Sequence, residues 1–157
     1  MRHITRIFLL SALMTAAVTA HAQDATAPAA EQTQTAAAMP EGISAPAEGM
    51  GQIVFFRPSK FKGAAISYKV REGETELGKL NNGAYFVVQV APGAHAYTVH
   101  SEAKDVLNLE VEAGETYYVV GGISMGFMAG RPNLSPATEA DFQAAAAKLK
   151  PAKPLKD

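Results

Sequence analysis

Apolar and polar side chains alternate in short segments between residues 51 and 122, and a turn signal separates the segments. The segments are rich in Val, Ile, Tyr and Phe, and the turns recur at about ten-residue intervals, which is typical of β-sandwiches and barrels. The pattern predicts an all-β fold, an antiparallel β-sandwich of about seven strands with a short C-terminal helix. The strands are expected at Gly51–Arg57, Ala64–Arg71, Thr75–Lys79, Ala84–Val90, Ala94–Ser101, Val106–Glu112 and Thr116–Gly122.

The residues between these strands favour tight turns, because Gly and Asn reach positive φ and Pro fixes φ. The turns are expected at Glu72-Gly73, Asn82-Gly83, Pro92-Gly93 and Ala113-Gly114, and they favour antiparallel neighbours.

Alternate residues of a strand point to opposite faces, so the apolar set of each strand predicts its core face. These sets are Ile53/Phe55, Ile66/Tyr68/Val70, Phe86/Val88/Val90, Tyr97/Val99 and Leu107/Leu109/Val111. For the last strand the pattern leaves two options open, Tyr117/Val119 or Tyr118/Val120.

The region after the last expected strand differs from the sandwich. Residues 123–130 form an apolar stretch rich in Gly and Met, which is expected to be a loop. The final helix is expected to have Ser135 as its N-cap and Pro136 at its first position, followed by Phe142 and a run of alanines.

Both ends of the chain differ in composition from the domain. Residues 1–22 have the basic start, the apolar run and the Ala20-His21-Ala22 cleavage site of a signal peptide. Residues 23–50 are rich in Ala, Pro and Glu with few large apolar residues, which predicts a disordered linker. The sandwich and helix are expected over 51–147, followed by a basic tail at 148–157.

Composition narrows the function. The chain has no Cys, which excludes thiol chemistry and disulfides and gives no site for a lipid anchor. With 14 Lys+Arg against 15 Asp+Glu, its charge of −1 does not favour a nucleic-acid partner. The apolar run at Ile7–Val18 is too short for a transmembrane helix, so the mature chain is expected to be periplasmic or secreted.

The order of the strand and turn motifs resembles a family of small exported bacterial domains of unknown function, many of them lipoproteins. Over about residues 50–145, the motifs that carry the resemblance are Gly51-Gln52-Ile53-Val54-Phe55-Phe56-Arg57-Pro58, Leu77-Gly78-Lys79-Leu80-Asn81-Asn82-Gly83-Ala84-Tyr85-Phe86, Ala91-Pro92-Gly93-Ala94-His95 and Ala113-Gly114-Glu115-Thr116-Tyr117-Tyr118-Val119. They are also similar to prealbumin-like and immunoglobulin-like sandwiches. The resemblance implies an exported β-sandwich and no particular activity.

Two groups of residues are candidates for binding. Arg57, Lys60 and Lys62 follow the first strand closely and are suited to holding a phosphate, a uronate or another anionic group of a polymer. Met125, Phe127 and Met128 lie in the expected Gly/Met loop, which either binds a partner or folds back as a lid over the sandwich.

Catalytic and metal-binding patterns are weak. Ser124 lies in a G-x-S-x-G segment, but no His follows it and no helix is expected directly after it. His95 and His100 are five residues apart on one expected strand, which places them on opposite faces. Alternation would place Glu72, Glu74 and Glu76 on one side of a hairpin, without the spacing of a calcium loop.

The sequence therefore predicts a non-enzymatic cell-envelope protein without a cofactor, which binds an envelope protein or a cell-wall polymer. The alternative is a carbohydrate- or polyanion-binding domain that uses Arg57, Lys60 and Lys62. A small hydrolase that uses Ser124 is the least favoured option.

Overall fold

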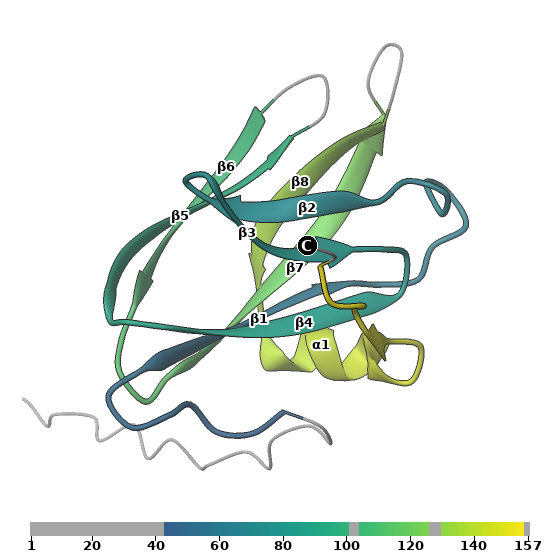
Figure 1. Ribbon diagram of the computed structural model, residues 1–157. Coiled ribbons are helices and arrows are strands. Elements are labelled where there is room, and N and C mark those ends of the chain that lie inside the picture. The colour runs from purple at the N-terminus through teal and green to yellow at the C-terminus, as the bar shows by residue number, and fades with distance from the viewer. Residues whose placement is uncertain (1–42, 101–103, 126–129, 156–157) are drawn as a thin grey trace, which may run out of the picture. The chain divides into compact units, whose positions relative to one another are not determined.

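The computed structural model describes residues 43–100, 104–125 and 130–155, without the side chain of Met125. Over these residues it has nine strands and one helix, with the strands in two packed sheets (Figure 1). The predicted all-β sandwich with a C-terminal helix is confirmed, with nine strands in place of seven. The predicted signal peptide and residues 23–42 of the predicted linker lie outside the described residues.

The first sheet has five strands in the order β8-β7-β1-β4-β9. They are β1 (Gly51–Arg57), β4 (Ala84–Val90), β7 (Thr116–Met125), β8 (Gly130–Ala137) and β9 (Lys150–Pro151). β1 and β4 have the bounds that the sequence predicts. β1 is antiparallel to β4 but parallel to β7, and β9 is parallel to β4, so the sandwich is not antiparallel throughout.

The second sheet has four strands in the order β3-β2-β5-β6, and all its neighbours are antiparallel. They are β2 (Tyr68–Glu72), β3 (Thr75–Leu80), β5 (Gly93–His100) and β6 (Lys104–Val111). β2 begins four residues later than predicted, because the chain from Pro58 to Ser67 forms a long connection between the sheets.

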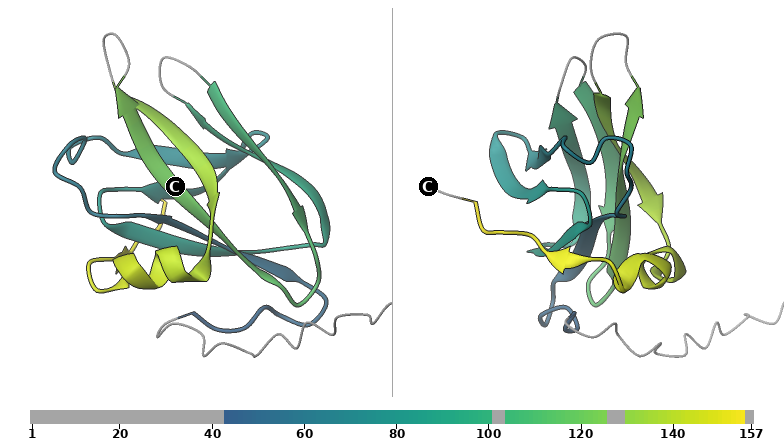
Figure 2. Two further views of the ribbon diagram at one scale, coloured as in Figure 1. Left: turned by 180° about the vertical axis from the view of Figure 1, so that it is seen from behind. Right: turned by 90° about the vertical axis from the view of Figure 1, so that its right-hand side faces the viewer.

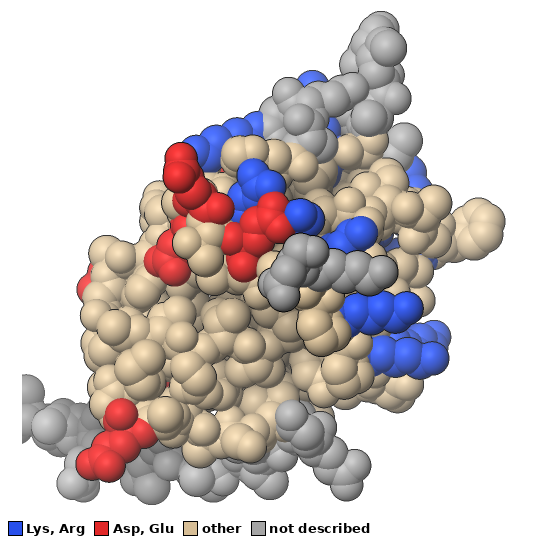
Figure 3. Space-filling model, viewed as in Figure 1, with Lys and Arg blue, Asp and Glu red and all other residues tan. Residues whose placement is uncertain are grey.

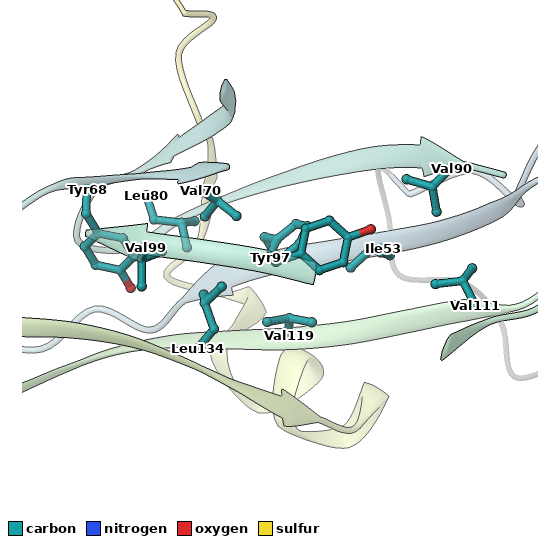
Figure 4. Packing of buried hydrophobic residues seen from close by; sticks show 11 residues of the cluster. Ile53, Tyr68, Val70, Leu80, Val90, Tyr97, Val99, Val111, Val119 and Leu134 are labelled. Carbon is teal, nitrogen blue, oxygen red and sulfur yellow. The ribbon is translucent and has the colours of Figure 1, made fainter. Parts of the chain in front are cut away.

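The main core lies between the two sheets (Figure 4). Ile53 and Val119 from the first sheet meet Val70, Tyr97 and Val99 from the second. Nearly all the predicted core-facing sets point into this space, whereas Ile66 lies outside the second sheet's strands and is only partly buried.

A second apolar cluster covers the outer face of the first sheet. The helix α1 (Glu139–Ala146) lies against this face (Figures 1 and 2). It places Phe142 against Phe56 and Tyr118, and Phe142 is only 3% exposed. Because of this cover, every residue of β1 is buried. Both options for the last predicted strand are therefore correct: Tyr117 and Val119 face the main core, and Tyr118 and Val120 face the helix.

The predicted helix start was wrong. Ser135 and Pro136 belong to the edge strand β8, and α1 begins at Glu139 with Thr138 as its N-cap. The Leu134 amide donates to Asp105 Oδ2 at 2.9 Å, so amide nitrogens at alternate positions of β8 are directed away from β7. A proline at such a position removes no bond from the ladder, which is why Pro132 and Pro136 fit in this strand.

Only one of the four predicted turns joins two paired strands. Glu72-Gly73 connects β2 to β3, whereas Asn82-Gly83, Pro92-Gly93 and Ala113-Gly114 carry the chain from one sheet to the other. Gly83, for example, has φ +70°, yet β3 and β4 are not paired. Turn residues specify the local backbone angles, and these angles do not decide whether the flanking strands pair.

Residues 43–50 contact the folded part of the chain. Ile43 is 5% exposed and belongs to the cluster under the helix. The buried Gln52 side chain donates from Nε2 to the Ser44 carbonyl at 2.9 Å, and the Ala47 amide donates to Gln89 Oε1 at 3.1 Å. In the predicted tail, Lys150–Pro151 pairs with β4.

We expect residues 43–50 to stabilise the domain and residues 23–42 not to. A chain that begins at Gly51 should lose about 2 kcal/mol of unfolding free energy relative to one that begins at Ile43, because Ile43 is removed from an apolar cluster. This loss corresponds to a fall in Tm of roughly 10 °C, measured by circular dichroism. A chain that begins at Gln23 should match the one that begins at Ile43. Equal Tm values for all three chains would show that residues 43–50 do not stabilise the domain.

Candidate anion-binding site

Arg57 ends β1 and holds the connection between the two sheets. Its side chain is buried, with 3% of the residue exposed. Nη1 donates to the Ile66 carbonyl at 2.5 Å and Nη2 donates to the Gly63 carbonyl at 2.7 Å. The guanidinium also lies over the Tyr68 ring, 5.5 Å from its centroid. Arg57 is therefore a structural residue of the connection, a role that the sequence did not indicate.

The positive charge of Arg57 has no counter-ion in the part of the chain that the structure describes, where no carboxylate forms an ion pair with it. Burial raises the pKa of Tyr68, although the charge of Arg57 lowers it in part, so the phenol beside the guanidinium stays neutral. An arginine does not lose its proton in a protein. A buried cation without a counter-ion makes its surroundings favourable for an anion.

A cavity of about 280 Å³ lies beside Arg57, where β7 and β8 extend beyond the end of β1. Lys60 and Lys62 also line it, so the structure brings all three predicted cationic residues to one cavity. None of its described lining residues is acidic. The remaining lining residues are Pro58, Val120, Gly121, Gly122, Ile123, Ser124, Asn133 and Ser135.

Asn133 contributes a polar group that the sequence did not predict. Its Oδ1 is buried and has no hydrogen-bond partner among the described residues. Gly122 is the residue opposite Asn133 on β7, and a Cβ atom there would lie 2.5 Å from Oδ1. The oxygen thus occupies the space that a side chain at position 122 would fill. Asn133 therefore brings a side-chain amide with a buried, unpartnered oxygen to the lining of the cavity.

The connection that carries the two lysines is held by backbone and side-chain bonds. The Lys60 amide donates to Asn82 Oδ1 at 2.9 Å, and the Ala64 amide donates to the Phe61 carbonyl at 3.2 Å. Gly63 has φ +78°, a conformation that favours glycine, and it offers its carbonyl to Arg57. The lysine side chains are therefore carried by an ordered turn.

The predicted partner-binding loop is only partly described. β7 extends to Met125 and β8 begins at Gly130, so residues 123–125 and 130, half of the region expected to be a loop, lie in a pair of strands. The side chain of Met125, together with Phe127 and Met128, lies outside the described residues. Whether these residues form a lid or a binding patch stays a prediction.

Ser124 lies within β7 and pairs with Arg131 of β8. A nucleophile elbow requires a turn from a strand directly into a helix, whereas here β7 is followed by an antiparallel strand. The structure therefore gives Ser124 a place in the lining of the cavity and no elbow geometry.

His95 and His100 lie on opposite sides of β5, as predicted. His95 Nδ1 is 2.6 Å from Glu72 Oε1 and its Nε2 is 2.8 Å from the Ala91 carbonyl oxygen. Its ring stacks on Tyr97, with 5.9 Å between the ring centroids. His95 thus joins the ends of β2 and β5, and His100 is exposed on the other face.

The prediction that Glu72, Glu74 and Glu76 share one side was wrong. Gly73 and Glu74 form a two-residue turn, which pairs Glu72 with Thr75 and places Glu76 on the opposite face. Glu76 forms ion pairs with Lys69 and Arg71 there. Over the described residues, no group of three His, Asp or Glu side chains is placed to hold a metal ion.

Comparisons with known proteins give a family without a known function. Residues 47–132, more than half of the chain, match the family described as "Protein of unknown function (DUF2846)". No curated protein and no solved structure matches the chain. Within the described part of the chain, no helix combines the length and the apolar character needed to cross a bilayer.

The His95–Glu72 pair predicts a pH-dependent contribution to stability. Burial of the ring lowers the pKa of His95, but the hydrogen bonds to Glu72 and Ala91 and the charges of Glu72 and Glu110 outweigh it, so the pKa is raised above 6.5. The stabilisation from this pair is complete below the pKa that His95 has in the unfolded chain. It is lost as the pH rises through the higher pKa that His95 has in the folded protein.

The variant His95→Gln should therefore lose more stability at pH 5.5 than at pH 8.5, measured by urea unfolding at both values. His100→Gln, which changes an exposed His on the opposite face of β5, is the matched control and should show no such difference. Equal losses for His95→Gln at the two pH values would contradict the assignment.

Proposed function

The chain belongs to the DUF2846 family of proteins of unknown function, and we propose that it is an exported, non-enzymatic binding module that holds an anionic group in the cavity beside Arg57. The proposed location is the periplasm or the outside of the cell, and it rests on the signal-peptide pattern of residues 1–22. The proposed ligand is an anionic component of the cell envelope.

The observation that supports this proposal is the buried charge of Arg57, which pairs with no carboxylate of the described residues. The guanidinium is fixed by two carbonyl groups and cannot move to a distant carboxylate. Lys60 and Lys62 add two mobile cations at the same cavity. An anion bound there would be attracted by all three charges, whereas a neutral ligand would gain nothing from them.

The size of the cavity limits what it can hold. At about 280 Å³ it is slightly below the range of roughly 300–1,000 Å³ that is usual for small-molecule sites. It therefore suits the charged headgroup or side group of a larger molecule rather than a whole extended ligand. An envelope polymer or lipid carries such groups in many copies.

The test is an NMR titration of the folded protein with inorganic phosphate and, separately, glucuronate at low ionic strength. We expect saturable shifts of the amides of residues 57, 59–63, 122 and 133, which weaken as salt is added. The double variant Lys60→Gln/Lys62→Gln should bind about tenfold more weakly, because two charge-assisted contacts are lost.

The control for this titration is Lys79→Gln/Lys104→Gln, which removes the same charge from exposed positions outside the cavity. It should bind within about twofold of the unmodified protein, because exposed charges at a distance are screened. Arg57 is unsuitable for the test, since its removal would also release the Ile66 and Gly63 carbonyls. Equal affinities of the two double variants, or shifts outside this region only, would reject the proposed site.

A further inference from the structure

Phe61 is an apolar residue that packs in neither of the two apolar clusters. It lies between Lys60 and Lys62, and its relative exposure is 101%. Among the described residues the other large apolar side chain with high exposure is Val106, at 48%. Phe61 does not line the cavity beside Arg57, and its side chain is fully exposed next to the two lysines that do.

The backbone presents this ring in a defined position. The carbonyl of Phe61 accepts from the Ala64 amide at 3.2 Å, and the Ile66 amide donates to the Gly63 carbonyl at 3.0 Å. The same segment is held at both ends, by Asn82 and by Arg57. An aromatic side chain on such a turn can enter an apolar medium without unfolding anything, and little backbone order has to be gained on binding.

The donors at the cavity favour a phosphoryl group over a carboxylate. Both terminal nitrogens of Arg57 already donate to carbonyls. Arg57 therefore contributes positive charge to the cavity rather than a free pair of donors for bidentate binding. The other donors in the lining are the ammonium groups of Lys60 and Lys62, the hydroxyl groups of Ser124 and Ser135, and the side-chain amide of Asn133. Lysine binds phosphate as a point charge from any direction, whereas arginine is the residue for planar, two-point recognition of a carboxylate.

We propose that this end of the domain docks on an anionic phospholipid surface, with a headgroup phosphate in the cavity and the ring of Phe61 inserted among the headgroups. The inference rests on the proposed anion site and names its ligand. A lipid surface places phosphoryl groups directly above an apolar layer, so it engages the cations and the projecting ring at the same time.

Basic side chains lie on the side of the molecule from which the connection between β1 and β2 projects. In Figure 3 they lie along the right-hand side of the view, away from the acidic side chains, which lie at the left and centre together with further basic ones. A soluble polymer is the weaker fit, because an aromatic ring that stacks on a sugar would have to lie over the cavity. Phe61 lies outside its lining.

The experiment is co-sedimentation of the chain from Gln23, which omits the apolar run of the predicted signal peptide, with two kinds of vesicle. One kind contains phosphatidylcholine alone, and the other also contains phosphatidylglycerol. We expect stronger binding to the anionic vesicles. The variant Phe61→Ser should reduce the partition coefficient about tenfold, and Lys60→Gln/Lys62→Gln should reduce it by about fivefold for each lysine removed.

Two matched variants distinguish this docking mode from nonspecific hydrophobic adsorption and from attraction by the overall charge of the protein. Val106→Ser removes the other exposed apolar side chain, and Lys79→Gln/Lys104→Gln removes the same charge elsewhere. Both should leave the partition coefficient within about twofold of the unmodified protein. Circular dichroism of every variant checks that the sandwich is folded.

The outcomes separate the two proposals. If the vesicles do not bind, or if Phe61→Ser and Val106→Ser behave alike, the lipid surface is rejected. The anion site still stands in that case if inorganic phosphate shifts the amides around Arg57 in a lysine-dependent way. Binding of soluble polyphosphate without vesicle binding would assign the site to a polymer. Absence of both phosphate and vesicle binding would reject both proposals.

Discussion

Burial of β1 on both faces is the constraint on which the rest of the molecule depends. A strand in a two-layer sandwich normally needs cover on one face only, but Gly51–Arg57 carries apolar side chains on both. Its inner face is satisfied by the second sheet, and its outer face by Phe142 and Ile43. The helix and residues 43–50 are therefore parts of the folded unit and are needed to remove β1 from water.

The same burial explains why the strand ends with a cation. Arg57 continues the inward-facing positions of β1, where an apolar residue would leave the carbonyls of Gly63 and Ile66 without these donors. The guanidinium satisfies them and fixes the long connection to β2. Its charge cannot be satisfied by carbonyl dipoles alone, so a structural requirement of the fold leaves a positive cavity at its edge.

Local patterns in the sequence predicted those features of the structure that depend on residues close together in the chain. β1 and β4, the alternation of Leu107, Leu109 and Val111, and the clustering of Arg57 with the two lysines all follow from short-range spacing. β8 could not be found in this way, because its two prolines argue against a strand. They fit only in an edge strand whose proline nitrogens are directed away from the neighbouring strand, and the sequence does not show this. Asn133 was missed for the same reason, since it reaches the cavity only through β8.

The prolines of β8 have a consequence for self-association. An exposed sheet edge offers unpaired amide groups to a strand from another molecule, which is a common route to aggregation. On the outward side of β8, the nitrogens at positions 132 and 136 carry no hydrogen, and the hydrogen at Leu134 is already held by Asp105. An approaching strand would find no donor across residues 132–136. β8 therefore resists pairing with a strand of another molecule, although it has no charged residue at its centre.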